Sequence, residues 1–162
     1  MNLGLEGKRA VVCGSTQGIG NAAATELAIL GASITLVARN EEKLKAAMAD
    51  LDVSKGQKHN YISVDFTQPE ELRTKLQTYA EEFNAHILIN NTGGPPGGPA
   101  NAAHTDEYIQ AFTNHLICNQ IFVQNLMEGM KSEGYGRIIN IISTSVKQPL
   151  NGLGVSNTIR GA

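Results

Sequence analysis

Apolar and polar positions alternate along the chain in two rhythms. Short apolar runs rich in β-branched residues are separated by longer segments in which apolar residues recur with helical spacing. This pattern predicts a βαβα order of elements. Because helical crossovers join parallel strands, we expect a doubly wound α/β fold, with helices on both faces and ligands outside the carboxyl ends of the strands. The five predicted strands are 9–13, 34–38, 61–64, 86–89 and 137–142.

The helical segments also predict their own ends and buried faces. Asn40 is the expected N-cap of the second helix. Thr67 and Glu70 have the spacing of a capping box for the third, which should run to about Phe83. The fourth is expected as one long helix over 106–130. The expected buried stripes are Ile19, Ala23, Leu27 and Leu30 before Gly31 ends the first helix, Leu44, Met48 and Leu51 in the second, and Ile109, Phe112, Leu116, Val123, Met127 and Met130 in the fourth.

Composition narrows the class of protein. A length of 162 residues, with 41% hydrophobic and 17% charged residues, favours a single globular domain over 1–162. A net charge of -2 without a basic stripe argues against nucleic acid as a partner. The two cysteines, Cys13 and Cys118, are too few and too distant for a disulfide framework or a metal site. No signal peptide or membrane-spanning run is present, so we expect a soluble, cytoplasmic protein.

The segment GSTQGIG follows the first predicted strand and opens the first helix. Gly14 suits a tight turn, Gly18 lets the backbone approach a pyrophosphate, and Gly20 allows close packing of helix on strand. The helix N-terminus would then offer free N–H groups to the phosphates. This context predicts a Rossmann-like dinucleotide site, and the alternative is a glycine-rich turn needed only for packing.

Two side chains at strand ends bear on which dinucleotide binds. Arg39 stands about where such domains place the acid that binds the ribose of NAD, roughly 20 residues past the turn. An arginine there can pair with a 2′-phosphate, which favours NADP(H) over NAD(H), although it could also pack on a solvated surface. Asp65, after the third strand, could accept a hydrogen bond from the adenine amino group or simply begin a helix.

Several segments together resemble the short-chain dehydrogenase/reductase family, in particular its 3-oxoacyl-acyl-carrier-protein reductase-like members. GSTQGIG is similar to that family's TGxxxGIG, NNTGG to its NNAG, and GRIINIIS to its fifth strand and catalytic serine. Cys13 and Thr92 depart from the family's threonine and alanine. The cofactor-binding residues that the resemblance and the glycine turn imply are Gly14, Ser15, Thr16, Gln17, Gly18, Ile19, Gly20, Arg39, Asn40, Asp65, Phe66, Asn91, Thr92 and Gly93.

The resemblance implies hydride transfer between a nicotinamide and a carbonyl, assisted by a serine, a tyrosine, a lysine and an asparagine. Carried over by position, the serine is Ser143, the tyrosine Ser156, the lysine Arg160, and the asparagine His115 or, one register away, Asn114. No tyrosine in the chain has a lysine four residues later, so a shifted register does not restore the YxxxK motif. A serine hydroxyl is a much weaker acid than a phenol.

A histidine could take over the proton transfer. We hypothesise that His115, or a water held by His115, Ser143 and Ser156, donates the proton, since an ordinary imidazole titrates near neutral pH. The alternative is a hydrogen-bonded core histidine. Lys147 could also reach the site or be a solvated loop residue. Two functions therefore stay open: an NADP(H)-dependent oxidoreductase, and a nucleotide-binding regulatory or structural subunit without catalysis.

The chain also resembles only part of a family member. Members run to about 250 residues, so we expect a domain that is incomplete at its C-terminus, with the last strands missing and the fifth strand left as an exposed edge. The full-length form is expected to act on a small-molecule carbonyl substrate and to form a homo-oligomer through the long helix.

Overall fold

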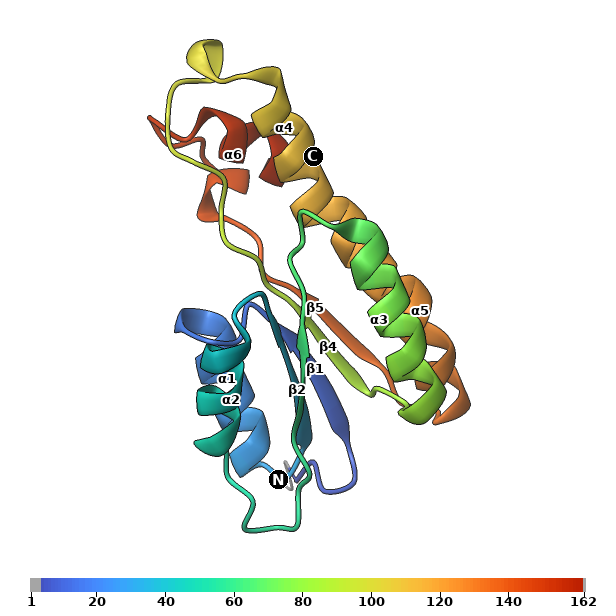
Figure 1. The fold of residues 1–162 in the computed structure, drawn as a ribbon. Helices are drawn as coiled ribbons and strands as arrows, with labels where there is room; N and C mark the ends of the chain where they lie inside the picture. The colour runs from blue at the N-terminus through green and yellow to red at the C-terminus, as the bar shows by residue number, and fades with distance from the viewer. Residues whose placement is uncertain (1–3, 162) are drawn as a thin grey trace.

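The computed structural model describes residues 4–161 and confirms the doubly wound, Rossmann-like α/β fold. Within these residues, five parallel strands lie in the order β3-β2-β1-β4-β5 (Figure 1). The order reverses between β1 and β4, which is where sheets of this type bind ligands. The strands are β1 (Arg9–Cys13), β2 (Ser33–Ala38), β3 (Asn60–Ser63), β4 (Ile87–Asn90) and β5 (Arg137–Asn140), and the helices are α1 (Gly18–Ile29), α2 (Glu41–Ala49), α3 (Pro69–Glu82), α4 (Thr105–Phe112), α5 (Cys118–Ser132) and α6 (Gly154–Gly161).

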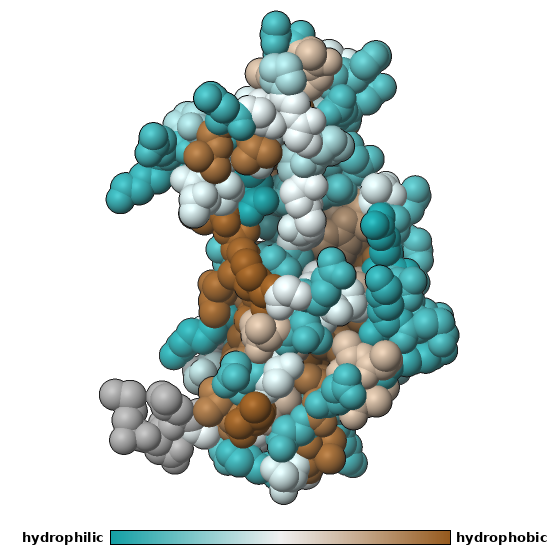
Figure 2. Space-filling model, turned by 90° about the vertical axis from the view of Figure 1, so that its left-hand side faces the viewer, coloured by the Kyte–Doolittle hydropathy of each residue, from teal (hydrophilic) through white to brown (hydrophobic). Residues whose placement is uncertain are grey.

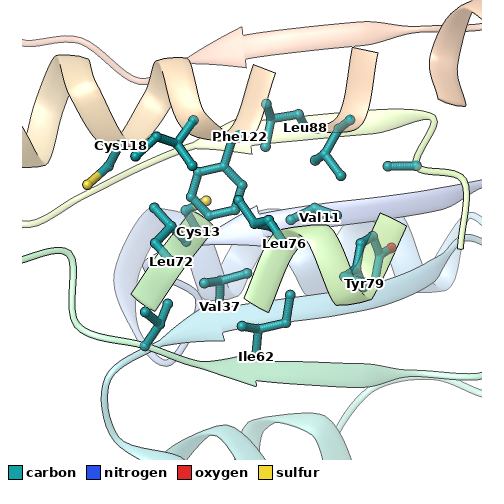
Figure 3. Packing of buried hydrophobic residues seen from close by; sticks show 14 of the residues in the cluster. Val11, Cys13, Val37, Ile62, Leu72, Leu76, Tyr79, Leu88, Cys118 and Phe122 are labelled. Atoms are coloured by element: carbon teal, nitrogen blue, oxygen red, sulfur yellow. The ribbon is translucent and has the colours of Figure 1, made fainter. Parts of the chain in front are cut away.

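Helices cover both faces of the sheet and bury a core on each side. Strand β1 alternates, with Val11 and Cys13 in the cluster under α3 and α5, and Ala10 and Val12 in the cluster under α1 and α2. Phe122 of α5 is the largest fully buried side chain and lies at the centre of the first cluster (Figure 3). Burying one such ring contributes about 1.5–3 kcal/mol, so this packing fixes the β1 end from which the glycine turn starts.

Helix α1 buries a different face from the predicted one. Its buried residues are Gly20, Ala24 and Ala28, whereas Ile19 is 62% exposed. A Cβ at Gly20 would collide with backbone oxygens of Cys13 and Gly14. The helix therefore lies so close to β1 that only small residues fit beneath it. Ala23 and Leu27 of the predicted stripe are partly buried against the edge of this core.

The predicted capping box at the start of α3 was wrong. The N-cap is Gln68, and its side chain makes no capping hydrogen bond. Instead, the Asp65 carboxylate accepts from the backbone N–H of Thr67 at 2.9 Å. This local turn satisfies the backbone before the helix starts, and Pro69 then occupies the first helical position, where its missing N–H costs little.

The predicted long helix over 106–130 is interrupted. A π-helical segment, Thr113–Ile117, separates α4 from α5. Its wider turn shifts the register, so only part of the predicted stripe faces the core, where Met130 is buried and Val123 packs against the cluster under α3 and α5. Ile109 is 65% exposed and Leu116 50% exposed, and Phe112 and Met127 are also exposed. The buried residues of α5 are Cys118, Ile121, Phe122, Leu126 and Met130.

Strand β5 forms the edge of the described sheet. It ends at Asn140, two residues earlier than predicted, although the Ile141 N–H still donates to Asn90 O at 2.9 Å. All four residues of β5 are exposed, and Ile138, Ile139 and Ile142 present large apolar side chains to solvent. Figure 2 shows a band of hydrophobic residues on this side, between the lower body of the molecule and the end that carries α6. An exposed parallel edge was predicted here, and the structure has one.

Candidate functional site: a cleft at the carboxyl ends of the strands

A cleft of about 670 Å³ opens at the carboxyl ends of β1, β2, β3 and β4. Such a position at the switch point of the sheet is where doubly wound folds bind ligands. The cleft contains twelve of the predicted cofactor residues and one predicted catalytic residue. These are Gly14, Thr16, Gln17, Gly18, Ile19, Arg39, Asn40, Asp65, Phe66, Asn91, Thr92 and Gly93, together with Asn114.

The glycine turn has the backbone that a phosphate cradle requires. Gly14 and Gly18 both have φ of 58°, in the left-handed region that glycine adopts without strain. A Cβ at Gly14 would lie 2.6 Å from the carbonyl oxygen of Asn91. Helix α1 starts at Gly18 without a side-chain cap and without an acidic residue in its first turn. Its N-terminal N–H groups and its dipole are therefore available to an anion.

Two predicted residues, Ser15 and Gly20, hold the turn in place rather than lining the cleft. The buried Ser15 hydroxyl accepts from the Val37 N–H at 2.9 Å, which ties the turn to β2. Gly20 is buried where α1 crosses the turn. On the other side, the Asn91 amide donates to the carbonyl oxygens of Cys13 and Gly14, at 3.3 and 3.4 Å. The turn is thus fixed from β2 and from the loop after β4.

The ends of β2 and β3 form the polar side of the cleft. Arg39 follows β2, and Asn40 caps α2 by accepting from the Lys43 N–H at 2.9 Å, as predicted. Asp65 and Phe66 follow β3, and Asp65 is already hydrogen-bonded to Thr67 N–H. That hydrogen bond supports a role of Asp65 at the start of α3. Asp65 also lines the cleft, so the predicted hydrogen bond to the adenine amino group stays a prediction.

His115 lies beside the cleft in a pair with Thr92. Thr92 Oγ1 and His115 Nδ1 are 2.6 Å apart, and His115 belongs to the π-helical segment. Burial, assisted by the positive charge of Arg160, lowers the pKa of His115 to about 4. The imidazole is therefore neutral at pH 7, which argues against the hypothesis that an imidazolium at His115 donates the proton, and agrees with the hydrogen-bonded alternative.

The other carried-over catalytic residues come from two segments after β5. Ser143 caps the short 3-10 turn Thr144–Val146 and accepts from the Ser145 hydroxyl at 2.8 Å. Ser156 is buried in α6. Arg160 donates to Ile141 O at 2.8 Å, and burial lowers its pKa. Its positive charge contributes to the lowered pKa of His115. Of these carried-over residues, Ser143, Ser156 and Arg160 do not line the cleft. Lys147 is exposed in the loop after β5.

Sequence reasoning missed several residues of the cleft. Lys43 is the one that carries a charge, and it lies one turn after the N-cap Asn40 on the same side of α2 as Arg39. That spacing was a usable signal, since a residue three positions after an N-cap faces the same end of the helix. The other missed residues are Val37, Ala38, Val64, Thr67 and Gly94.

Comparison with known protein families shows to which family this chain belongs. The family model described as short chain dehydrogenase matches residues 8–156. The chain belongs to the short chain dehydrogenase family. The resemblance seen in the glycine turn, the NNTGG segment and the fifth strand is thereby confirmed.

Individual relatives show how similar the chain is to known members. A granaticin polyketide synthase putative ketoacyl reductase 1 of Streptomyces violaceoruber is 33% identical, over 86% of this chain and 52% of its own length. The inactive hydroxysteroid dehydrogenase-like protein 1 of Homo sapiens is 30% identical, over 88% of this chain and 44% of its own. The chain thus spans about half the length of these curated relatives.

Solved structures agree with the fold. The L-sorbose reductase of Gluconobacter frateurii, in complex with NADPH and L-sorbose, is 30% identical with a TM-score of 0.92. The match covers 99% of this chain and 62% of the reductase. Within residues 4–161, no helix combines the length and the apolar character needed to cross a membrane.

Proposed function

We propose that this chain is the nucleotide-binding part of an NADP(H)-dependent oxidoreductase that transfers a hydride between the nicotinamide and a carbonyl or alcohol substrate. The observation that carries the proposal is the glycine turn Gly14–Gly20 at an uncapped helix N-terminus, with Arg39 in the same cleft. Linked phosphates fit the turn and a 2′-phosphate fits the guanidinium. The NADPH complex of the sorbose reductase supports this choice over NAD(H).

The chain's own residues would bind and orient rather than perform the redox step. When bound, the nicotinamide supplies the hydride or accepts it. Gly14, Gly18 and the first turn of α1 would hold the pyrophosphate, and Asn91 would keep the turn in place. Arg160, in α6, would stabilise a developing negative charge, since a guanidinium stays positive at neutral pH. Asn114 would line the path to the nicotinamide.

The alternative is a subunit that binds the nucleotide without turning over a substrate. Serine at 156 and arginine at 160 support it, as does the neutral state of His115. The human relative described as inactive shows that non-catalytic members exist near this sequence. The retained Ser143 and the polar nature of the replacements favour the enzyme.

Separate observations support the substrate class and the partners. The ketoacyl reductase relative supports a 3-oxoacyl thioester as one candidate carbonyl. Exposed apolar side chains on α4 and α5, Ile109, Phe112 and Met127 among them, support homo-oligomer formation through these helices. The two cysteines, both free and buried, support a reducing compartment such as the cytoplasm.

A binding assay and an activity assay together test the proposal. The natural full-length polypeptide would be titrated calorimetrically with NADPH and NADH, and then incubated with NADPH and a panel of ketones, ketoses and 3-oxoacyl thioesters. We expect saturable binding that is tighter for NADPH, and loss of the reduced nicotinamide absorbance with at least one substrate. Binding without any turnover would favour the non-catalytic subunit, and no binding of either nucleotide would overturn both readings.

A further inference from the structure

The first turn of α2 contains charges of both signs next to the expected 2′-phosphate site. Glu41 and Glu42 precede Lys43, and Lys45 follows within the same nine-residue helix. A phosphate monoester carries close to two negative charges at pH 7. Carboxylates beside it would weaken binding, so the way these four side chains are arranged determines whether the site can hold a 2′-phosphate.

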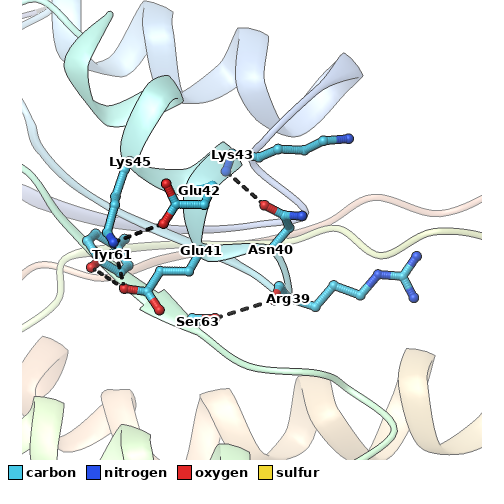
Figure 4. A network of polar contacts seen from close by, with 8 residues as sticks. All are labelled: Arg39, Asn40, Glu41, Glu42, Lys43, Lys45, Tyr61 and Ser63. Atoms are coloured by element: carbon cyan, nitrogen blue, oxygen red, sulfur yellow. Dashed lines mark hydrogen bonds and ion pairs between the residues drawn. The ribbon is translucent and has the colours of Figure 1, made fainter.

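The structure separates the charges to opposite sides of Asn40 (Figure 4). Arg39 and Lys43 extend to one side, where both line the cleft. Neither side chain has an ion-pair or hydrogen-bond partner within residues 4–161. Two unpaired cations at one end of a cleft form a positive site that an anion can enter without first breaking an ion pair.

The carboxylates are held on the other side. Lys45 Nζ lies 3.1 Å from Glu41 and 3.1 Å from Glu42. The Tyr61 hydroxyl, from β3, donates to Glu41 at 2.9 Å. These hydrogen bonds, first that of Lys45 and then that of Tyr61, lower the pKa of Glu41, which therefore keeps its full charge at neutral pH.

We propose that Lys43 is a second ligand of the 2′-phosphate beside Arg39, and that Lys45 and Tyr61 are positioning residues that hold Glu41 and Glu42 away from it. This inference rests on the proposed binding of NADP(H). NADH has a free 2′-hydroxyl in place of the phosphate, so the arrangement acts on the choice between the two nucleotides and leaves the pyrophosphate site unaffected.

Nucleotide titrations with matched lysine variants test the role of Lys43. Lys43→Met is expected to weaken NADPH binding roughly tenfold, the value of one charged hydrogen bond, and to leave NADH binding unchanged. Lys131→Met removes the same charge from the last turn of α5, where Lys131 pairs with Glu128, and should leave both affinities unchanged. An NADPH affinity for Lys43→Met equal to that of this control, or an equal loss for both nucleotides, would overturn the assignment.

A double-variant cycle tests the positioning role. Lys45→Met should weaken NADPH binding about threefold by releasing carboxylates toward the phosphate. Adding Glu41→Gln should restore most of the affinity, whereas a lysine that only stabilises α2 would show no such rescue. Far-ultraviolet circular dichroism checks that α2 is intact. Absence of rescue would overturn the positioning role, and a wild-type protein that binds neither nucleotide would instead overturn the proposed function itself.

Discussion

The glycine-turn end of the cleft presents backbone groups, whereas the end near Thr92 presents side chains. At the phosphate end, one continuous segment from β1 through α1 supplies backbone groups. Close packing at Gly14 and Gly20 and the hydrogen bond from Val37 to Ser15 hold this segment in place. At what we call the catalytic end, after the residues that the resemblance implies there, single side chains come from separate segments: Thr92 after β4, His115 in the π-helical segment and Arg160 in α6. The geometry of the first site depends on close packing. The chemistry of the second depends on the residue types at a few positions.

This difference predicts that the two ends respond differently to substitutions. A backbone cradle survives most substitutions that preserve the turn, since its donors are the same for every residue except proline. A proton-donating site does not, because replacing a phenol by an aliphatic hydroxyl removes the group that can titrate. We therefore expect substitutions at the second end to affect catalysis before they affect nucleotide binding.

The largest expected effect comes from breaking the packing at the phosphate end. Gly20→Ala would place a Cβ against backbone oxygens of Cys13 and Gly14, which cannot move without displacing β1. We expect a loss of about 3 kcal/mol in the free energy of unfolding, measured by urea denaturation, and loss of saturable NADPH binding.

Gly161→Ala is the matched control for this substitution. Among the described residues, a Cβ there meets nothing within 4 Å, and alanine is the better helix former, so stability should change by less than about 1 kcal/mol. A Gly20→Ala variant as stable as this control would mean that the turn is not held by packing, and the comparison between the two ends would fail.

Local backbone features were predictable from the sequence, and close packing was not. The glycine turn and the Asn40 cap follow from residues next to one another along the chain. The buried face of α1 does not, because only the three-dimensional closeness of Gly20 to Cys13 selects small residues there.

The π-helical segment limited prediction in a second way. One wider turn at Thr113–Ile117 changes which face of α5 is buried, yet no single residue type announces it. The pair of Thr92 with His115 could not be predicted either, since it joins segments 23 residues apart. Catalytic candidates could be named by position, but their contacts and protonation states required the fold.

A second prediction separates binding from selectivity within the phosphate end. Arg39→Met should weaken NADPH binding roughly 30-fold, because a guanidinium facing a phosphate contributes about 2 kcal/mol. NADH binding should stay within about twofold, since the backbone cradle is untouched. Calorimetric titration of both nucleotides gives the ratio. Equal weakening of both would place Arg39 in the cradle itself rather than at the 2′-phosphate.

A third prediction concerns the neutral state of His115 at the catalytic end. Its folded pKa of about 4 lies below the ordinary value of 6.5, so between these values the unfolded chain binds more protons. This contribution to stability is present above pH 6.5 and is lost as the pH falls toward 4. The imidazole is partly exposed, so screening reduces the loss to about 1–2 kcal/mol.

His115→Gln isolates this contribution. Unfolding free energies of both proteins would be compared between pH 4 and pH 7, with His86, whose pKa burial also lowers, unchanged in each. We expect the wild type to lose more stability in acid than the variant. Parallel pH curves would show that His115 is not held neutral, and the hypothesis of a histidine proton donor would regain its basis.

The smallest expected effect tests whether the catalytic end is a connected group or a set of independent side chains. Thr92→Val keeps the shape of the side chain and removes the hydroxyl that lies 2.6 Å from His115 Nδ1. Losing one such hydrogen bond should cost about 1 kcal/mol in unfolding free energy. NMR titration should also show a changed His115 pKa, while NADH affinity stays the same. If instead the affinity fell and the titration of His115 did not change, Thr92 would belong functionally to the nucleotide end, because its hydroxyl would then be contacting the bound nucleotide rather than orienting the imidazole.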